Sequence, residues 1–233
     1  MIEETVKKRG VLMIPAFAME RTQALLFEIN ALAVAGRIPD VPVFLDSPLG
    51  IRLTALYRTY DRYLDHGPTG RKGADQQHLF DFPGLTMTST TEESKAINDV
   101  PAPKIIIAGA GMMHGGRILH HLKRYLPDPK STLLIIGYQA EGSLGRRILE
   151  GAQSVKIHGE DIVARARVTA IGGYSAHADQ RQLLSWIRPL RKSLKRVFLV
   201  QGEESAARAL AGRITDELAL RADVPAIGDF AVL

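Results

Sequence analysis

The sequence repeats one arrangement: a short apolar run, a loop rich in glycine or proline, and a segment whose apolar residues recur at helical spacing. The first apolar run is residues 11–14, and its loop at residues 15–19 leads into a predicted helix over residues 20–35. Three further units have apolar runs at 41–45, 105–108 and 132–136, followed by predicted helices at 51–64, 117–125 and 144–149. Apolar runs that alternate with helices are typical of a parallel sheet covered on both faces. We therefore predict an α/β fold with a mainly parallel, doubly wound sheet.

The loops of these units are predicted to form the binding edge. Ligands of open parallel sheets bind at the carboxyl ends of the strands. The loops that contain Phe17, Asp46, Met113 and Glu141 should therefore gather along one edge. Because Asp46 ends a strand and is followed by Ser-Pro, we interpret it as a turn cap rather than a metal ligand. A capping-box pattern at 89–92 predicts a short helix that ends at residue 97.

The pattern changes after residue 152. Residues 154–157 and 161–170 are predicted to be antiparallel strands joined by a hairpin turn at 158–161. We then expect a helix to about residue 190, a strand at 197–200, a helix at 205–218 and a last short strand at 230–232. The predicted domains are accordingly residues 8–153 and 154–233.

The run Gly172–Asp179 joins a predicted half-buried strand to a predicted helix. Asp179 can cap that helix, which holds His177 near exposed backbone N–H groups. Such a turn attracts anions such as phosphate, and a histidine there can donate a proton to a phosphate ester. The competing interpretation is a turn histidine that is satisfied by local hydrogen bonds.

Composition limits the classes of protein. The chain has 233 residues, 45% of them hydrophobic, enough for one large domain or two small ones. It has no cysteine, which excludes disulfides and thiolate metal sites and fits a cytoplasmic location. No apolar run approaches the roughly 18 residues of a membrane span, and we expect no signal peptide and no membrane partner. The net charge of +5 suits a polyanionic partner.

Five motifs in order resemble the β-CASP branch of the metallo-β-lactamase superfamily. They lie at residues 14–23, 46–49, 111–117, 137–146 and 175–179, so the resemblance covers roughly residues 8–233. It implies a zinc-dependent nuclease that cuts RNA, or DNA in some branches, with the β-CASP segment inserted as a lid. It also implies that His177 is the catalytic residue that contacts the scissile phosphate, with Ser175 as a phosphate neighbour.

The sequence departs from the family pattern at its metal sites. The family's HxHxDH run is absent, and the adjacent residues His120 and His121 would point about 100° apart on a helix. We therefore predict no metal ligand and no bound cofactor in this chain. The zinc ligands are expected in a preceding metallo-β-lactamase part of the parent protein, without which the chain is inactive. Gln201 stands where the family usually has a zinc-binding histidine, and an amide is a poor zinc ligand. The alternative is thus a non-catalytic relative that binds RNA or protein.

Several basic and aromatic residues are candidate RNA contacts. Arg21, Arg117 and Arg146 lie in or just after the strand-end loops, and we predict that they bind the substrate. Trp186 is interpreted as a core residue rather than a base-stacking platform. A second basic group is interpreted as a solvated helix end; it comprises Arg188, Arg191, Lys192, Lys195 and Arg196.

A nucleotide-dependent enzyme is the third hypothesis. Gly109-Ala110-Gly111 after a strand is typical of dinucleotide binding, but His114 occupies the sixth position of that fingerprint and no strand ending in Asp or Glu follows about 20 residues later. The sequence leaves open RNA or DNA as substrate, endo- or exonucleolytic cutting, and a homo-oligomer.

Overall fold

The computed structural model describes residues 1–63, 80–173 and 177–231. The chain divides into two compact units, Met1–Ser175 (unit 1) and Ala176–Leu233 (unit 2). The predicted helix end at Leu64, Ser175 and Val232 lie outside the described residues.

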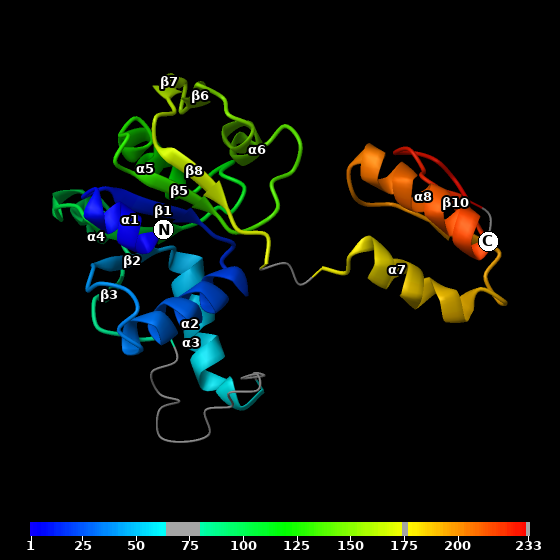
Figure 1. Cartoon of the computed structure of the whole chain (residues 1–233), viewed down its shortest axis with the longest axis horizontal. Coiled ribbons are helices and arrows are strands. Elements are labelled where there is room, and N and C mark those ends of the chain that lie inside the picture. Colours follow the sequence, from blue (N-terminus) through cyan, green and yellow to red (C-terminus); the bar gives the residue numbers. More distant parts are fainter. Residues whose placement is uncertain (64–79, 174–176, 232–233) are drawn as a thin grey trace. The chain divides into compact units, whose positions relative to one another are not determined.

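Unit 1 is built from short strands that alternate with helices (Figure 1). In chain order its elements are α1 (Ile2–Lys7), β1 (Val11–Pro15), α2 (Arg21–Val34), β2 (Val43–Asp46), α3 (Pro48–Thr59), η1 (Asp61–Tyr63), β3 (Leu85–Met87), α4 (Thr91–Ala96), η3 (Ile97–Asp99), β4 (Lys104–Ala108), α5 (Ile118–Tyr125), β5 (Thr132–Ile135), α6 (Leu144–Leu149), β6 (Ser154–Ile157), β7 (Glu160–Val163) and β8 (Arg167–Ala170).

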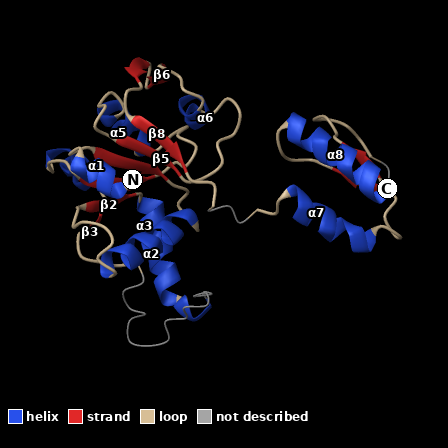
Figure 2. Cartoon of the chain, viewed as in Figure 1, coloured by secondary structure: helices blue, strands red, loops and turns tan. Residues whose placement is uncertain are grey.

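Six of these strands form one sheet in the order β3-β2-β4-β1-β5-β8, and every neighbouring pair is parallel. Figure 2 shows the strands between helices, with α2 and α3 on one side of the sheet and α5 and α6 on the other. The predicted α/β class and the doubly wound parallel sheet are confirmed.

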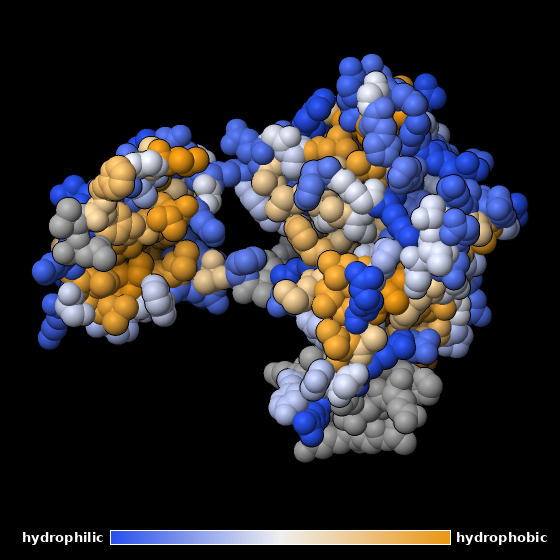
Figure 3. Space-filling view, turned by 180° about the vertical axis from the view of Figure 1, so that it is seen from behind, coloured by the Kyte–Doolittle hydropathy of each residue, from blue (hydrophilic) through white to orange (hydrophobic). Residues whose placement is uncertain are grey.

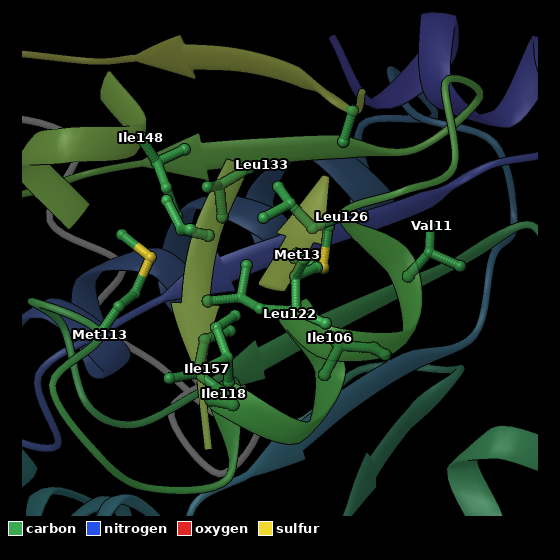
Figure 4. Packing of buried hydrophobic residues seen from close by; sticks show 14 of the residues in the cluster. Val11, Met13, Ile106, Met113, Ile118, Leu122, Leu126, Leu133, Ile148 and Ile157 are labelled. Atoms are coloured by element: carbon green, nitrogen blue, oxygen red, sulfur yellow. The ribbon is translucent and has the colours of Figure 1, made fainter. Parts of the chain in front are cut away.

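Alternate residues of each central strand face two separate apolar layers. In β1, Val11 and Met13 belong to the layer under α5 and α6, whereas Leu12 and Ile14 belong to the layer under α2. Figure 4 shows the first layer, in which Met13 packs near residues of α5 such as Leu122. Because both faces are covered, the strands read as continuous apolar runs instead of alternating ones.

Among the helix starts that differ from their predicted positions, those of α3 and α4 are explained by their caps. α3 begins at Pro48 because the Ser47 side chain accepts a hydrogen bond from the Gly50 N–H and so caps it. The capping box of α4 lies one residue later than predicted, with Thr90 as the cap and Glu93 as its partner. In both cases the residue directly before the helix, Ser47 or Thr90, caps it and so fixes where the helix begins.

The predicted strand over 161–170 is wrong in its extent and partly in its pairing. β6 and β7 form the expected antiparallel hairpin, with the turn at His158 and Gly159. The ladder then breaks because the N–H groups of Arg165 and Ala166 both donate to the carbonyl of Leu126. The chain continues as β8, which pairs with β5 in parallel at the edge of the main sheet.

Unit 2 contains two helices and a two-stranded parallel sheet. Its elements are α7 (Gln180–Ile187), η4 (Arg188–Leu190), β9 (Arg196–Phe198), α8 (Glu204–Leu218) and β10 (Arg221–Asp223). One apolar cluster joins both helices to both strands. Within the described residues the last strand is β10, and the described part of the predicted strand, Phe230 and Ala231, is not in a strand; Phe230 is 100% exposed.

The interpretation of Trp186 as a core residue is also wrong. Its side chain is 71% exposed, whereas Leu184 and Ile187 on the same helix are buried. Trp186 lies two residues after Leu184, which is about 200° around the helix axis and therefore on the outer face.

Among the described helices, none combines the length and the hydrophobicity needed to cross a membrane.

Candidate functional site

The predicted loops lie at one edge of the six-stranded sheet. β2, β4, β1 and β5 are adjacent and parallel, so their carboxyl ends meet there. Phe17 follows β1, Asp46 ends β2, Met113 follows β4 and Glu141 follows β5. The helices change sides between β1 and β4, because α2 leaves β1 toward one face of the sheet and α5 leaves β4 toward the other. This is a topological switch point, where open α/β sheets bind ligands.

The ring of Phe17 occupies the switch point. A Cβ atom at Gly111 would lie 2.8 Å from Cδ2 of Phe17, and one at Gly137 would lie 3.7 Å from its Cε2. Three strand-end loops therefore meet around one aromatic ring. In a dinucleotide site the glycine in the place of Gly111 lets the backbone approach a pyrophosphate, but here Phe17 fills the space beside it. This packing weakens the nucleotide hypothesis.

Asp46 is the centre of a buried hydrogen-bond network. Its Oδ1 accepts from Thr88 Oγ1 at 2.7 Å and from Nη1 of Arg117 at 2.8 Å. Its Oδ2 accepts from Ser94 Oγ at 2.7 Å and lies 2.7 Å from Nε2 of His121. The carboxylate is fully buried. It is therefore neither a turn cap nor an exposed ligand but the link between β2, α4 and α5.

Opposing effects act on the pKa of Asp46. Burial alone raises this pKa, but the hydrogen bonds from His121, Ser94, Thr88 and Arg117 together outweigh burial and lower the pKa to about 2. The carboxylate thus stays ionised across the physiological range.

Arg117 directs most of its donors inward. Besides Asp46, its guanidinium donates to the carbonyls of Thr88 at 2.9 Å and Ser89 at 3.0 Å. These bonds join the start of α5 to the segment that leads into α4. The structure thus places Arg117 at the edge as predicted. Its side chain holds two loops together. Its contact with substrate stays a prediction.

Gln139 holds the loops on the other side of the switch point. Its Nε2 donates to the carbonyls of Gly111, Gly137 and Tyr138 at 3.0–3.2 Å. Its buried Oε1 has no hydrogen-bond partner among the described residues and lies against Gly145, where a Cβ would be only 1.7 Å away. No sequence pattern indicates this role of Gln139, because its three partners come from two different loops.

The two other predicted arginines lie at the same edge. Arg146 in α6 pairs with Glu150 at 2.5 Å and reaches the carbonyl of Gln139 at 3.4 Å. Arg21 is the first residue of α2, and its guanidinium has no hydrogen-bond or ion-pair partner within the described part of the chain. Exposed residues near Arg21 include Phe17 and Met19, so this part of the edge offers both a cation and apolar surface.

His177 belongs to unit 2 and is exposed. Asp179 caps α7 as predicted: its Oδ1 accepts from the Gln182 N–H at 2.8 Å, and the Gln182 side chain accepts from the Asp179 N–H. His177 therefore precedes a fixed helix start. The predicted approach of His177 to the strand-end loops, with Ser175 beside it, stays a prediction.

The described residues do not form a metal site by themselves. Among residues 1–63, 80–173 and 177–231, no group of three or more His, Asp or Glu residues is arranged to hold a metal ion. His121 turns inward to Asp46, whereas the ring of His120 lies 4.9 Å from that of His158. Gln201 is exposed after β9. Zinc therefore does not fit this set of residues alone.

Two protein-family models match the sequence of this chain. Residues 22–148 match the model of the Beta-Casp domain, and residues 161–225 match that of the Zn-dependent metallo-hydrolase RNA specificity domain. The chain belongs to the β-CASP metallo-β-lactamase family. The predicted boundary at 153 falls between the two matches, whereas the compact units divide after residue 175, and the boundary stays a prediction.

Curated relatives of this β-CASP chain are longer than the chain itself. It is 39% identical over 229 residues to Ribonuclease TTHA0252 of Thermus thermophilus, covering 98% of this chain and 51% of the relative. It is 34% identical over 227 residues to an RNase J-like protein of Methanocaldococcus jannaschii, covering 97% of this chain and 51% of the relative. It is 31% identical over 222 residues to Transcription termination factor FttA of Methanosarcina mazei, covering 93% of this chain and 35% of the relative. The chain thus spans about half or less of the length of these relatives.

Proposed function

We propose that this chain is the β-CASP and RNA-specificity portion of a nuclease that hydrolyses RNA phosphodiester bonds. The observation that carries the proposal is the Beta-Casp match together with 39% identity to a ribonuclease over nearly the whole chain. The RNA-specificity match over residues 161–225 supports RNA as the substrate. We place the protein in the cytoplasm, in line with its lack of cysteine.

In this proposal zinc is the cofactor of the full-length protein. We assign its ligands to a metallo-β-lactamase part that precedes this chain; among the described residues no group is arranged to hold a metal ion. The coverage of 51% of the ribonuclease leaves room for such a part. The isolated chain then binds RNA without cutting it.

An open depression in unit 2, lined by both apolar and charged side chains, supports a missing neighbour. It has a volume of about 870 Å³, and its lining includes Phe198, Val200 and Phe230. Val200 is 75% exposed. Figure 3 shows hydrophobic side chains gathered on one face of unit 2. A surface of this kind marks an interaction site, and here we assign it to the preceding part of the same protein.

The residues of this chain have distinct parts in the proposal. His177 donates a proton to the phosphate ester or stabilises its developing charge, and Ser175 contacts the phosphate. Arg21 and Arg146 bind the RNA backbone at the strand-end edge. Arg117, which is bonded to Asp46 and two carbonyls, positions the same edge.

The test is RNA cleavage by the full-length protein. We expect zinc-dependent cleavage, a loss of about 10²–10⁴-fold in kcat for His177→Ala, and no cleavage by residues 1–233 alone. His158→Asn is the matched control: His158 lies at the β6–β7 turn with φ 51°, a conformation that asparagine tolerates. Cleavage by residues 1–233 alone, or full activity of His177→Ala, would contradict the proposal.

The second candidate is a non-catalytic relative, and Gln201 is the observation that favours it. In that case the full-length protein binds RNA or a partner protein but cuts nothing. Elemental analysis decides between the two. Two tightly bound zinc ions in the wild-type protein would remove this candidate, and a second zinc gained only by Gln201→His would support it.

A further inference from the structure

Trp186 is an exposed aromatic residue whose position the packing of unit 2 does not require. It is the only tryptophan of the chain and is 71% exposed, on the face of α7 opposite to Leu184 and Ile187. Tryptophan is highly buried on average in folded proteins. Because most of this ring stays in water, it contributes little to the stability of unit 2, and its role lies outside unit 2's own core.

The residues that follow Trp186 are strongly basic. Two of the cations are paired: Arg188 lies 3.7 Å from Glu217, and Arg196 is hydrogen-bonded to Asp223. Arg191, Lys192 and Lys195 are exposed and have no ion-pair partner in the described ranges. Arg191, Lys192 and Lys195 follow Trp186 by five, six and nine residues, so these cations lie close to the aromatic ring along the chain.

We propose that Trp186, Arg191, Lys192 and Lys195 form a binding surface for a single-stranded segment of RNA, separate from the His177 turn. The proposal rests on the proposed function only for the RNA substrate. Bases of a single strand stack on exposed aromatic rings with little sequence preference, and nearby cations neutralise the phosphates. A paired duplex offers no free base to Trp186.

Charge favours RNA over a protein as the occupant. An apolar protein face on Trp186 would also remove three unpaired cations from water, which is costly without compensating anions. A polyanion supplies those anions at regular spacing. A second copy of the chain carries a net charge of +5 and is disfavoured by the same argument; it is an outcome of the test below.

The first experiment uses the fluorescence of Trp186 in the 233-residue chain. Single-stranded oligouridine should quench this fluorescence, and a blunt RNA duplex should not. Because Trp186 is the only tryptophan, binding by its variants is measured by the fluorescence anisotropy of labelled oligouridine. Trp186→Ala should weaken this binding about 10-fold, and Trp186→Phe should retain most of the affinity. Lys192→Glu with Lys195→Glu should weaken binding and reduce the slope of log K against log salt by about 0.7 for each phosphate that is no longer neutralised. Lys95→Glu, on exposed α4, is the matched control and should change neither quantity by comparable amounts.

The second experiment separates this inference from the proposed function. In the full-length protein, Trp186→Ala should raise KM for long single-stranded RNA and leave kcat unchanged, whereas His177→Ala should lower kcat. Suppose the wild type cleaves RNA, and Trp186→Ala has the same RNA affinity and the same KM as wild type. That result would overturn the inference and leave the proposed function intact. Dissociation of a dimer by Trp186→Ala, measured by light scattering, would also overturn it. Absence of RNA binding and of cleavage in the full-length wild type would instead remove the proposed function.

Discussion

At the scale of single residues, Asp46 shows why the edge of the sheet is rigid. Its four partners come from residues 88, 94, 117 and 121, which lie on three different segments. The strand-end position of Asp46 could be predicted from the sequence, but these partners could not, because only the order of the strands brings them together. The carboxylate is a structural ion whose removal would leave Arg117 and His121 without their shared acceptor.

Asp46→Asn should lower the free energy of unfolding by about 2–4 kcal/mol, since a buried network loses its charge while its cationic donor remains. Urea unfolding of the 233-residue chain followed by circular dichroism measures this change. Asp40→Asn, at an exposed loop position, is the control and should stay within about 0.5 kcal/mol of wild type. Equal effects of the two substitutions would contradict the assigned role of Asp46.

The lowered pKa of Asp46 also predicts a dependence of stability on pH. Its pKa falls from 3.8 to about 2 on folding, so the folded state favours the ionised form. The resulting stabilisation, about 2 kcal/mol, is fully present above pH 4 and is lost as the pH falls through 2. The stability difference between wild type and Asp46→Asn should therefore shrink between pH 4 and pH 2. A difference that stays constant over this interval would contradict the ionised network.

Gly145→Ala tests the contact between α6 and Gln139. An added Cβ would lie 1.7 Å from Oε1 of Gln139 and 2.6 Å from Cε of Met113, so the Gln139 side chain must leave its three carbonyls. We expect a destabilisation of about 1–3 kcal/mol, measured by thermal or urea unfolding. Gly115→Ala is the control, because nothing lies within 4 Å of its Cβ position. Similar stability of both variants would show that the Gln139 contacts are replaceable.

At the scale of elements, the main sheet was predictable because its signal is local. Apolar runs such as Ile105–Ala108 are covered on both faces, and the helices that follow end near glycine or proline. The strands that the sequence analysis missed or misplaced have no such local apolar run followed by a helix. β3 has only three residues, and the split between β7 and β8 depends on the carbonyl of Leu126, which is distant in sequence.

The start of α7 is an element whose local chemistry carries its stability. Asp179→Ala removes the side-chain acceptor for the Gln182 N–H and should destabilise the helix by about 1 kcal/mol. Faster amide hydrogen exchange across residues 180–187 would report this loss. Ser185→Ala, at an exposed position inside the same helix, should not accelerate exchange. Unchanged exchange in Asp179→Ala would mean that tertiary packing alone fixes the turn that carries His177.

At the scale of the whole molecule, the two units differ in how completely their apolar surfaces are covered. The sheet of unit 1 has apolar clusters on both faces. The two strands of unit 2 share one cluster with α7 and α8, and the depression beside them is open. The chain covers only about half of relatives such as the ribonuclease of Thermus thermophilus. The difference between the units is explained if the preceding part of the protein packs on unit 2, as proposed above.

Val200→Ser tests that explanation by comparing two lengths of the protein. In the 233-residue chain Val200 is 75% exposed, so the substitution should change the free energy of unfolding by less than about 0.5 kcal/mol. In the full-length protein the same side chain would be buried by the preceding part, and the loss of two methyl groups should cost about 1–2 kcal/mol. Val34→Ser, at the exposed end of α2, should cost little in both proteins. If Val200→Ser costs the same small amount in both, the open face of unit 2 is not covered by the rest of the protein, and the depression beside Val200 belongs to another partner.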